Sequence, residues 1–369
     1  MSGTASETGG RGTRSAAIAR LRGGLGSTAG VYLVLLGVIA VAAVVVAAAG
    51  RNLFTPGNLT VLMTSIAVLG FVAIGQTLVI LVGSLDLSVA YLVSLSSVLA
   101  AGTMAGASGG TVPGIVTALV ATVVIGALTG CLVAYLRLSG FIASLGVGLL
   151  VAGYLASYYR GTTGKASPEL AAFGSASVGP LPVPTLLMLV CLVLAVILVG
   201  RTRMGMHLLA VGGDAHVARM SGVRAGTPVV VAHALSGLCA GIAGVVIVAR
   251  LGVGSPTVGE QGGYDLLSIA AVVLGGASLA GGRGSLWGTL GGILIFAVVD
   301  SAMGILQVNP FLKEVVRGVV IIAAVALYAR RAAPLVRRRF TDAAGPAPAE
   351  ASAAAAARPT ASVTEGAER

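Results

Sequence analysis

The sequence predicts an all-α, polytopic membrane protein with about ten transmembrane helices. Hydrophobic residues make up 56% of its 369 residues and charged residues only 9%, whereas a soluble domain carries roughly 25% charged residues. That shortage of charge excludes a water-soluble fold of this size, and the high apolar content excludes disorder. Glycine is abundant, at 55 residues, but follows no strict repeat, so a fibrous protein is excluded as well. In transmembrane helices glycine is a packing residue.

Ten apolar runs have roughly the length that crosses a bilayer, about 17–25 residues. Gly and Ser dilute the third and the eighth of them. The runs define a transmembrane domain over residues 31–330. Residues 1–30 are polar and residues 331–369 are basic and then Ala/Pro-rich, so we expect two disordered cytoplasmic tails. The ten runs cover residues 31–49, 61–82, 88–107, 113–136, 141–159, 183–199, 228–249, 266–280, 285–306 and 314–329.

The placement of basic residues predicts the orientation. With the N-terminus inside and ten spans, 17 of the 23 Lys and Arg residues fall on the inner side. Because cytoplasmic loops carry the excess of Lys and Arg, both termini are expected in the cytoplasm. No basic stripe alternates with aromatic residues, so the net charge of +11 does not indicate nucleic-acid binding.

The longest inner loop, residues 200–227, contains a predicted short helix on the cytoplasmic face. Asp214 is a typical helix-starting residue and Gly222 is a typical stop. The residues of this helix that we single out are Asp214, Ala218, Arg219, Ser221 and Gly222.

Two acids fall within or beside the apolar runs, where an ionised group is costly. For Asp86, between the second and third runs, the favoured interpretation is a cap that accepts backbone N–H groups of the third helix. Asp300, late in the ninth run, could be a proton relay, a substrate ligand or a helix–helix hydrogen bond. Its only basic candidates are Lys313 and Arg317. His233 stands alone at the start of a run and is interpreted as structural.

Gly284, Gly288 and Gly292 recur every fourth residue and predict a smooth ridge for close helix contact. The loop around Gly281 matches no phosphate-binding pattern, so the chain is not expected to hydrolyse ATP. Neither the three cysteines nor the three histidines show the spacing of metal ligands. Polar residues in an outer loop could contact a partner or form a solvated rim; they are Glu260, Gln261 and Tyr264.

Five sequence blocks occur in an order that resembles one family. They are GSLDLSVA, FIASLG, LAVGGDAHVARMSGV, IAAVVLGGASLAGGRGSLWGT and VVRGVVIIAAV. Together they resemble the permease subunits of bacterial monosaccharide ABC importers, in the ribose/xylose/galactose branch, over about residues 56–330. The chain departs from that family at Ala90, Asp214 and Asp300. At the last two positions the family often has Asn.

The resemblance implies a type II ABC importer permease of the bacterial plasma membrane, without cofactor or metal. A second permease copy would complete the pathway, a cytoplasmic ATPase would bind the inner helix at 214–222, and a sugar-binding protein would contact the outer loop. Sugar needs only weak polar contacts to pass. The candidates for such contacts are Gln76, Thr77, Asp86, Ser94 and Asp300. The alternative is an ion-coupled secondary transporter that uses Asp300.

Overall fold

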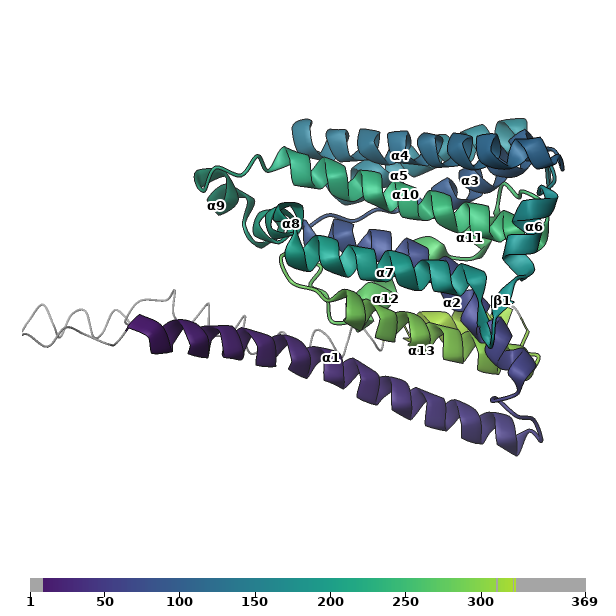
Figure 1. The fold of residues 1–369 in the computed structure, drawn as a ribbon, viewed down its shortest axis with the longest axis horizontal. Coiled ribbons are helices and arrows are strands. Elements are labelled where there is room, and N and C mark those ends of the chain that lie inside the picture. The colour runs from purple at the N-terminus through teal and green to yellow at the C-terminus, as the bar shows by residue number, and fades with distance from the viewer. Residues whose placement is uncertain (1–8, 310, 321, 323–369) are drawn as a thin grey trace, which may run out of the picture. The chain divides into compact units, whose positions relative to one another are not determined.

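The computed structural model describes residues 9–309, 311–320 and 322, with side chains from residue 28 onward. The described part is a bundle of helices that run side by side (Figure 1). Its helices are α1 (Gly9–Ala48), α2 (Pro56–Leu81), α3 (Val89–Met104), the 3-10 turn η1 (Ser108–Gly110), α4 (Thr111–Tyr135), α5 (Gly140–Tyr158), α6 (Pro168–Ser175), α7 (Val183–Arg201), α8 (Arg203–Gly213), α9 (Ala215–Met220), α10 (Gly226–Leu251), α11 (Val258–Gln261), α12 (Tyr264–Leu274) and α13 (Leu286–Ile305). Two short strands, β1 (Ser177–Val178) and β2 (Leu181–Pro182), form an antiparallel hairpin.

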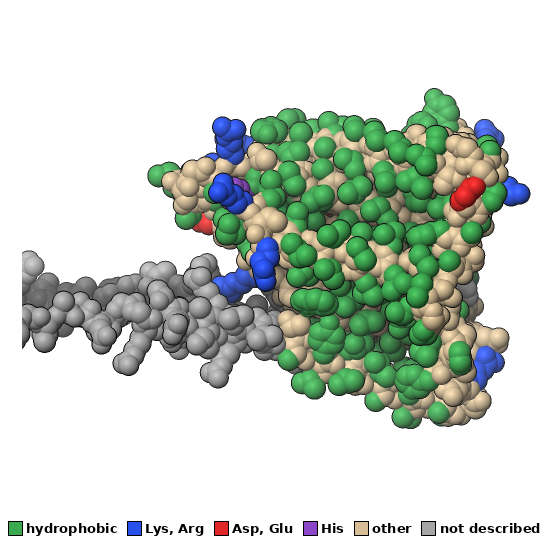
Figure 2. Space-filling view, viewed as in Figure 1, with side chains coloured by type: hydrophobic (Ala, Val, Ile, Leu, Met, Phe, Trp, Pro, Cys, Tyr) green, Lys and Arg blue, Asp and Glu red, His purple; other side chains and the backbone are tan. Residues whose placement is uncertain are grey.

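The surface of the bundle has the pattern of a membrane protein. Hydrophobic side chains cover the helices, and Lys and Arg gather at the two ends of the bundle (Figure 2). One end carries α8 and α9 and the opposite end carries α6, and we call them the α9 end and the α6 end (Figure 1). Within the described residues, seven helices are long and apolar enough to cross a membrane: α1, α2, α4 with its preceding turn, α5, α7, α10 and α13.

The remaining predicted spans differ from the sequence-based expectation. The third and eighth runs form shorter helices, α3 and α12, of 16 and 11 residues. Helix α3 ends at Met104, where Ala105 adopts a left-handed conformation, and α12 ends at Leu274, before the Gly-rich segment at residues 275–285. The tenth run lies partly outside the described residues, so ten spans are not confirmed. Helix α1 begins at Gly9, within the segment expected to be a disordered tail, and the expected tail at 331–369 lies outside the described residues.

Helix α2 forms the centre of the bundle. It is apolar on every side, which is typical of a fully buried helix. It packs against α7, α10, α12 and α13.

Close packing of α4 against α10 depends on small residues. A Cβ on Gly126 would lie 2.4 Å from the His233 carbonyl oxygen, and a Cβ on Gly237 would lie 2.3 Å from the Thr122 carbonyl oxygen. Lipid gives no hydrophobic drive between helices, so this contact is held by dispersion at short range.

The predicted glycine ridge proves to be an intramolecular contact. A Cβ on Gly288 would lie 2.0 Å from the Gly275 carbonyl oxygen, and one on Gly292 would lie 2.0 Å from that of Ala271. Both glycines of α13 therefore face α12 of the same chain. The inclusion of Gly284 in a continuous helical ridge was wrong, because α13 begins only at Leu286.

Replacing Gly288 by Leu should destabilise the protein. The added side chain must push α12 away from α13, and overpacking of this kind costs about 1–3 kcal/mol or more. Gly304 lies on the same helix with open space around it, so Gly304→Leu is the matched control. We expect Gly288→Leu to lower the monodisperse fraction in size-exclusion chromatography and the unfolding midpoint in detergent. Equal behaviour of the two variants would contradict the packing argument.

Candidate functional site

A polar break joins α2 to α3 inside the bundle. Gly83 has φ +77, a left-handed conformation that glycine adopts readily, and it turns the chain out of α2. The segment that follows meets side chains from other helices. Ser144 of α5 accepts from the Leu87 N–H at 3.0 Å, and its hydroxyl donates to the Leu85 carbonyl at 3.2 Å. With its amide oriented to match, Gln76 donates to the Asp86 carbonyl at 3.1 Å and accepts from the Asp86 N–H at 3.3 Å.

The carboxylate of Asp86 is the centre of this break, and it is completely buried. One oxygen accepts from the backbone N–H of Ser88 at 3.0 Å and from its hydroxyl at 2.6 Å. The other accepts from the Ser236 hydroxyl of α10 at 2.8 Å. The predicted role as helix cap therefore needs correction: the N-cap of α3 is Ser88, and Asp86 also ties the break to α10.

His233 completes the cluster, and the sequence-based interpretation missed its partners. Its Nε2 lies 3.0 Å from the Ser84 hydroxyl, and its Nδ1 lies 3.7 Å from an Asp86 oxygen. Among the described residues, Nδ1 has no hydrogen-bond partner. Ser236 lies three positions along the same helix and shares its face. This H-x-x-S spacing could have shown from the sequence that His233 and Ser236 share a face of α10. Nothing in the sequence indicated that this face lies against Asp86.

The other polar pathway candidates of α2 and α3 are also fully buried. The Thr77 hydroxyl lies 2.9 Å from that of Thr289 on α13. Ser94 accepts from the Gly259 N–H of α11 at 2.9 Å. In the described chain these side chains hold elements together, and their part in a sugar pathway stays a prediction.

At the α9 end, the predicted short helix is present. Asp214 is the N-cap of α9 and accepts from the N–H groups of His216 at 2.8 Å and Val217 at 3.1 Å. The hydrogen bonds from the Val217 and His216 backbone lower the pKa of Asp214, so its charge is retained at neutral pH. The chain turns away at Gly222, with φ +83.

The outer surface of α9 is apolar as well as charged. Val217 is 58% exposed and Met220 78% exposed, and Arg219 and Ser221 are exposed too. Ala218, which the sequence analysis placed in the same group, is buried and faces the protein. Helix α9 projects at the end of the bundle (Figure 1).

Toward the α6 end, Asp300 forms an ion pair with Arg317, one of its two predicted basic candidates. Two nitrogens of the guanidinium each lie 3.1 Å from a different Asp300 oxygen, and a third contact joins Arg317 to Glu314 at 2.6 Å. Glu260 and Gln261 are exposed on α11, whereas Tyr264 is half-buried at the start of α12.

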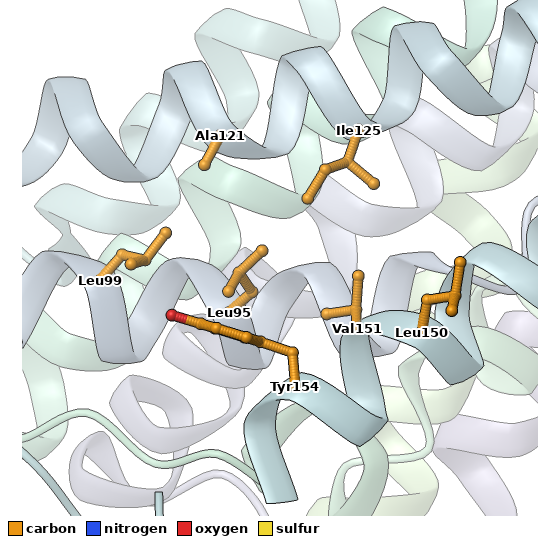
Figure 3. A pocket seen from close by; sticks show the side chains of 7 residues that line it. All are labelled: Leu95, Leu99, Ala121, Ile125, Leu150, Val151 and Tyr154. Carbon is orange, nitrogen blue, oxygen red and sulfur yellow. The ribbon is translucent and has the colours of Figure 1, made fainter. Parts of the chain in front are cut away.

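A lateral cleft of about 350 Å³ lies between α3, α4 and α5 (Figure 3). Among the described residues that line it, the Tyr154 hydroxyl is the only polar side-chain group. Because a sugar needs several hydrogen-bond partners, this cleft is not a sugar site. It is lined by Leu95, Leu99, Ala121, Ile125, Leu150, Val151 and Tyr154.

Removing the Asp86 carboxylate should destabilise the bundle. Asp86→Leu leaves the hydroxyls of Ser88 and Ser236 without their buried acceptor, and each buried group left unsatisfied costs about 1–3 kcal/mol. Asp86→Asn keeps the shape and an acceptor oxygen, so we expect a smaller loss. The measurement is the unfolding midpoint in detergent. If Asp86→Leu unfolds at the wild-type temperature, the cluster does not hold the break.

Comparisons with known proteins agree with this architecture. Residues 58–325 match the family described as branched-chain amino acid transport system / permease component. The ribose import permease protein RbsC of Escherichia coli K12 is 36% identical over 287 residues, 76% of this chain and 88% of the relative. RbsC of Bacillus subtilis 168 is 36% identical over 293 residues, covering 79% and 90%. The L-arabinose transport system permease protein AraH of E. coli K12 is 34% identical over 276 residues, covering 74% and 83%.

No solved structure matches the chain significantly. The apolar helices and the permease relatives together make it a multi-pass protein of the plasma membrane. The match covers most of the transmembrane domain, and the chain belongs to the family of branched-chain amino acid transport system permease components.

Proposed function

We propose that this chain is the membrane-spanning subunit of an ATP-driven importer that receives a monosaccharide from a binding protein. The observation that carries the proposal is that permeases named for ribose and for arabinose each match about three quarters of the chain. Those names cover more than one sugar, so the chemical class is supported and the individual sugar is not.

The ATPase would dock on α9. This helix is held in place by the Asp214 cap and offers exposed Val217, Arg219 and Met220 at the basic α9 end. Under this proposal the α9 end faces the cytoplasm, as do both termini. The exposed Glu260 and Gln261, with Tyr264, are the proposed contacts for the binding protein.

A second copy of the chain would complete the pathway, and α5 has the surface suited to it. Gly146 and Gly153 are exposed with open space around them, and Ser157 and Tyr158 are exposed beside them. Helix α5 also exposes Ile142, Leu149 and Leu150, but the outward face of α4 carries a row of valines with no small residue among them, typical of lipid contact, at positions 112, 116, 120 and 124. Small residues permit close approach of a second backbone.

The proposed function is tested by uptake into vesicles. The permease reconstituted with its ATPase and a sugar-loaded binding protein should take up sugar only when ATP is supplied. Uptake by the permease alone, abolished by dissipating the ion gradient, would overturn the proposal in favour of a secondary transporter.

Removing the charges on α9 should uncouple uptake while leaving the permease folded. Asp214→Asn keeps a good helix cap, so Asp214→Asn with Arg219→Gln removes charge without unwinding α9. We expect ATP-driven uptake to fall by about tenfold, as for a loss of about 1.4 kcal/mol of docking energy. Arg137→Gln, at an exposed arginine after α4, is the control. Full uptake by the double variant would show that its charges do not bind the ATPase.

Asp300→Asn should leave uptake in place. The Asn oxygen still accepts from Arg317, and Glu314 still balances the guanidinium charge. An acid paired with arginine in this way is a poor proton carrier, so this variant separates the two functions. Asp300→Leu, which removes the acceptor altogether, is the comparison and should reduce folded yield. Complete loss of uptake by normally expressed Asp300→Asn would indicate ion coupling.

A further inference from the structure

Three segments that lie far apart in the sequence meet through their backbones near the α9 end. They are the end of α2 with Gly83, the end of α8 at Gly212, and the turn between α12 and α13 at Gly281 and Gly282. We call these four residues the glycine junction. Each segment belongs to a different one of the sequence blocks GSLDLSVA, LAVGGDAHVARMSGV and IAAVVLGGASLAGGRGSLWGT, or directly adjoins it.

The contacts at Gly212, Gly281 and Gly282 leave no room for a side chain. A Cβ on Gly212 would lie 1.8 Å from the Leu81 carbonyl oxygen and 2.7 Å from the Gly282 nitrogen. One on Gly281 would lie 2.7 Å from the Gly212 carbonyl oxygen. Gly282 also donates its N–H to the Leu81 carbonyl at 3.0 Å, so the turn is hydrogen-bonded to the end of α2.

The junction lies between two features already described. On one side Gly212 lies two positions before Asp214, the cap of α9. On the other side Gly83 precedes Ser84, whose hydroxyl contacts His233 and thereby the Asp86 cluster. Backbone atoms in direct contact cannot be compressed, and no flexible side chain lies between them to absorb a shift. A displacement of α8 and α9 toward the end of α2 must therefore move Leu81 and Gly282.

We propose that the glycine junction transmits movement of α9 to the α2–α3 break and to the α12–α13 turn during each ATP-driven cycle. This rests on the proposed docking of the ATPase at α9. Gly212 is then a positioning residue for transport: it contacts neither the sugar nor the ATPase, and it acts through Leu81 and Gly282.

Two neighbouring glycines provide a matched test. A Cβ on Gly212 would strike Leu81, whereas one on Gly213 has nothing within 4 Å. Both end the same helix, so alanine at either position raises helix propensity alike. Each variant is assembled with the ATPase and sugar-loaded binding protein in vesicles, and three quantities are measured: bound ATPase, ATP hydrolysis and uptake.

We expect Gly212→Ala to bind the ATPase and hydrolyse ATP as the wild type does, while uptake per ATP falls by about tenfold or more, the usual scale of an overpacked contact. Gly213→Ala should match the wild type in ATPase binding, ATP hydrolysis and uptake. Equal uptake per ATP by the two variants would overturn the proposal. Failure of the wild-type assembly to show ATP-driven uptake would instead refute the proposed function.

If Gly212→Ala does not assemble with the ATPase and the binding protein, hydrogen exchange of the wild-type complex tests the proposal instead. Peptides covering residues 79–85 and 278–284 should change their exchange together with α9 when the ATPase is trapped with nucleotide. A change confined to α9 would overturn the proposal, because movement would then stop before the junction.

Discussion

The structure depends on one constraint: a backbone that leaves a helix inside a membrane must find its hydrogen-bond partners within the protein. The break at residues 83–88 satisfies this requirement. Main-chain groups of Leu85, Asp86 and Leu87 bond to Gln76 or Ser144, and the Ser88 N–H bonds to the Asp86 carboxylate. These partners come from α2 and α5, and Asp86 itself bonds to α10. One short segment therefore fixes the relative positions of several helices.

Elements defined by local signals could be predicted from the sequence. The long apolar runs became helices, and α9 begins and ends where Asp214 and Gly222 indicated, because capping is decided by neighbours in the chain. The short helices α3 and α12 were predicted too long, because the Ala and Gly residues after Met104 and Leu274 continue the apolar run although the helix has ended. The pairing of Asp86 with Ser236 and His233 was missed because it joins residues about 150 positions apart.

Glycine has two distinct roles in this fold: it permits close packing of two helices, and it permits close contact where helices end or the chain turns. The sequence alone does not show which role a given glycine has. Gly288 and Gly292 lie within α13 and let it pack against α12, as their spacing predicted. Gly284 has the same spacing but precedes the helix, so spacing alone overextended the ridge. At the junction, Gly212 in the last turn of α8 and the non-helical turn at Gly281 and Gly282 meet the end of α2, and no periodicity marks such a contact. Only the folded chain shows which backbone lies opposite.

The polar side chains inside the bundle also bear on where a sugar would pass. Gln76, Thr77, Asp86 and Ser94 are fully buried and their hydrogen bonds join elements of one chain. A side chain that binds a passing sugar must exchange partners with it, and breaking these bonds would leave buried polar groups unsatisfied. On the exposed face of α5, the Ser157 hydroxyl donates only to the Gly153 carbonyl of its own helix and Tyr158 is exposed, so contact with a sugar there breaks no bond between elements. This difference supports the proposed pathway between two copies of the chain.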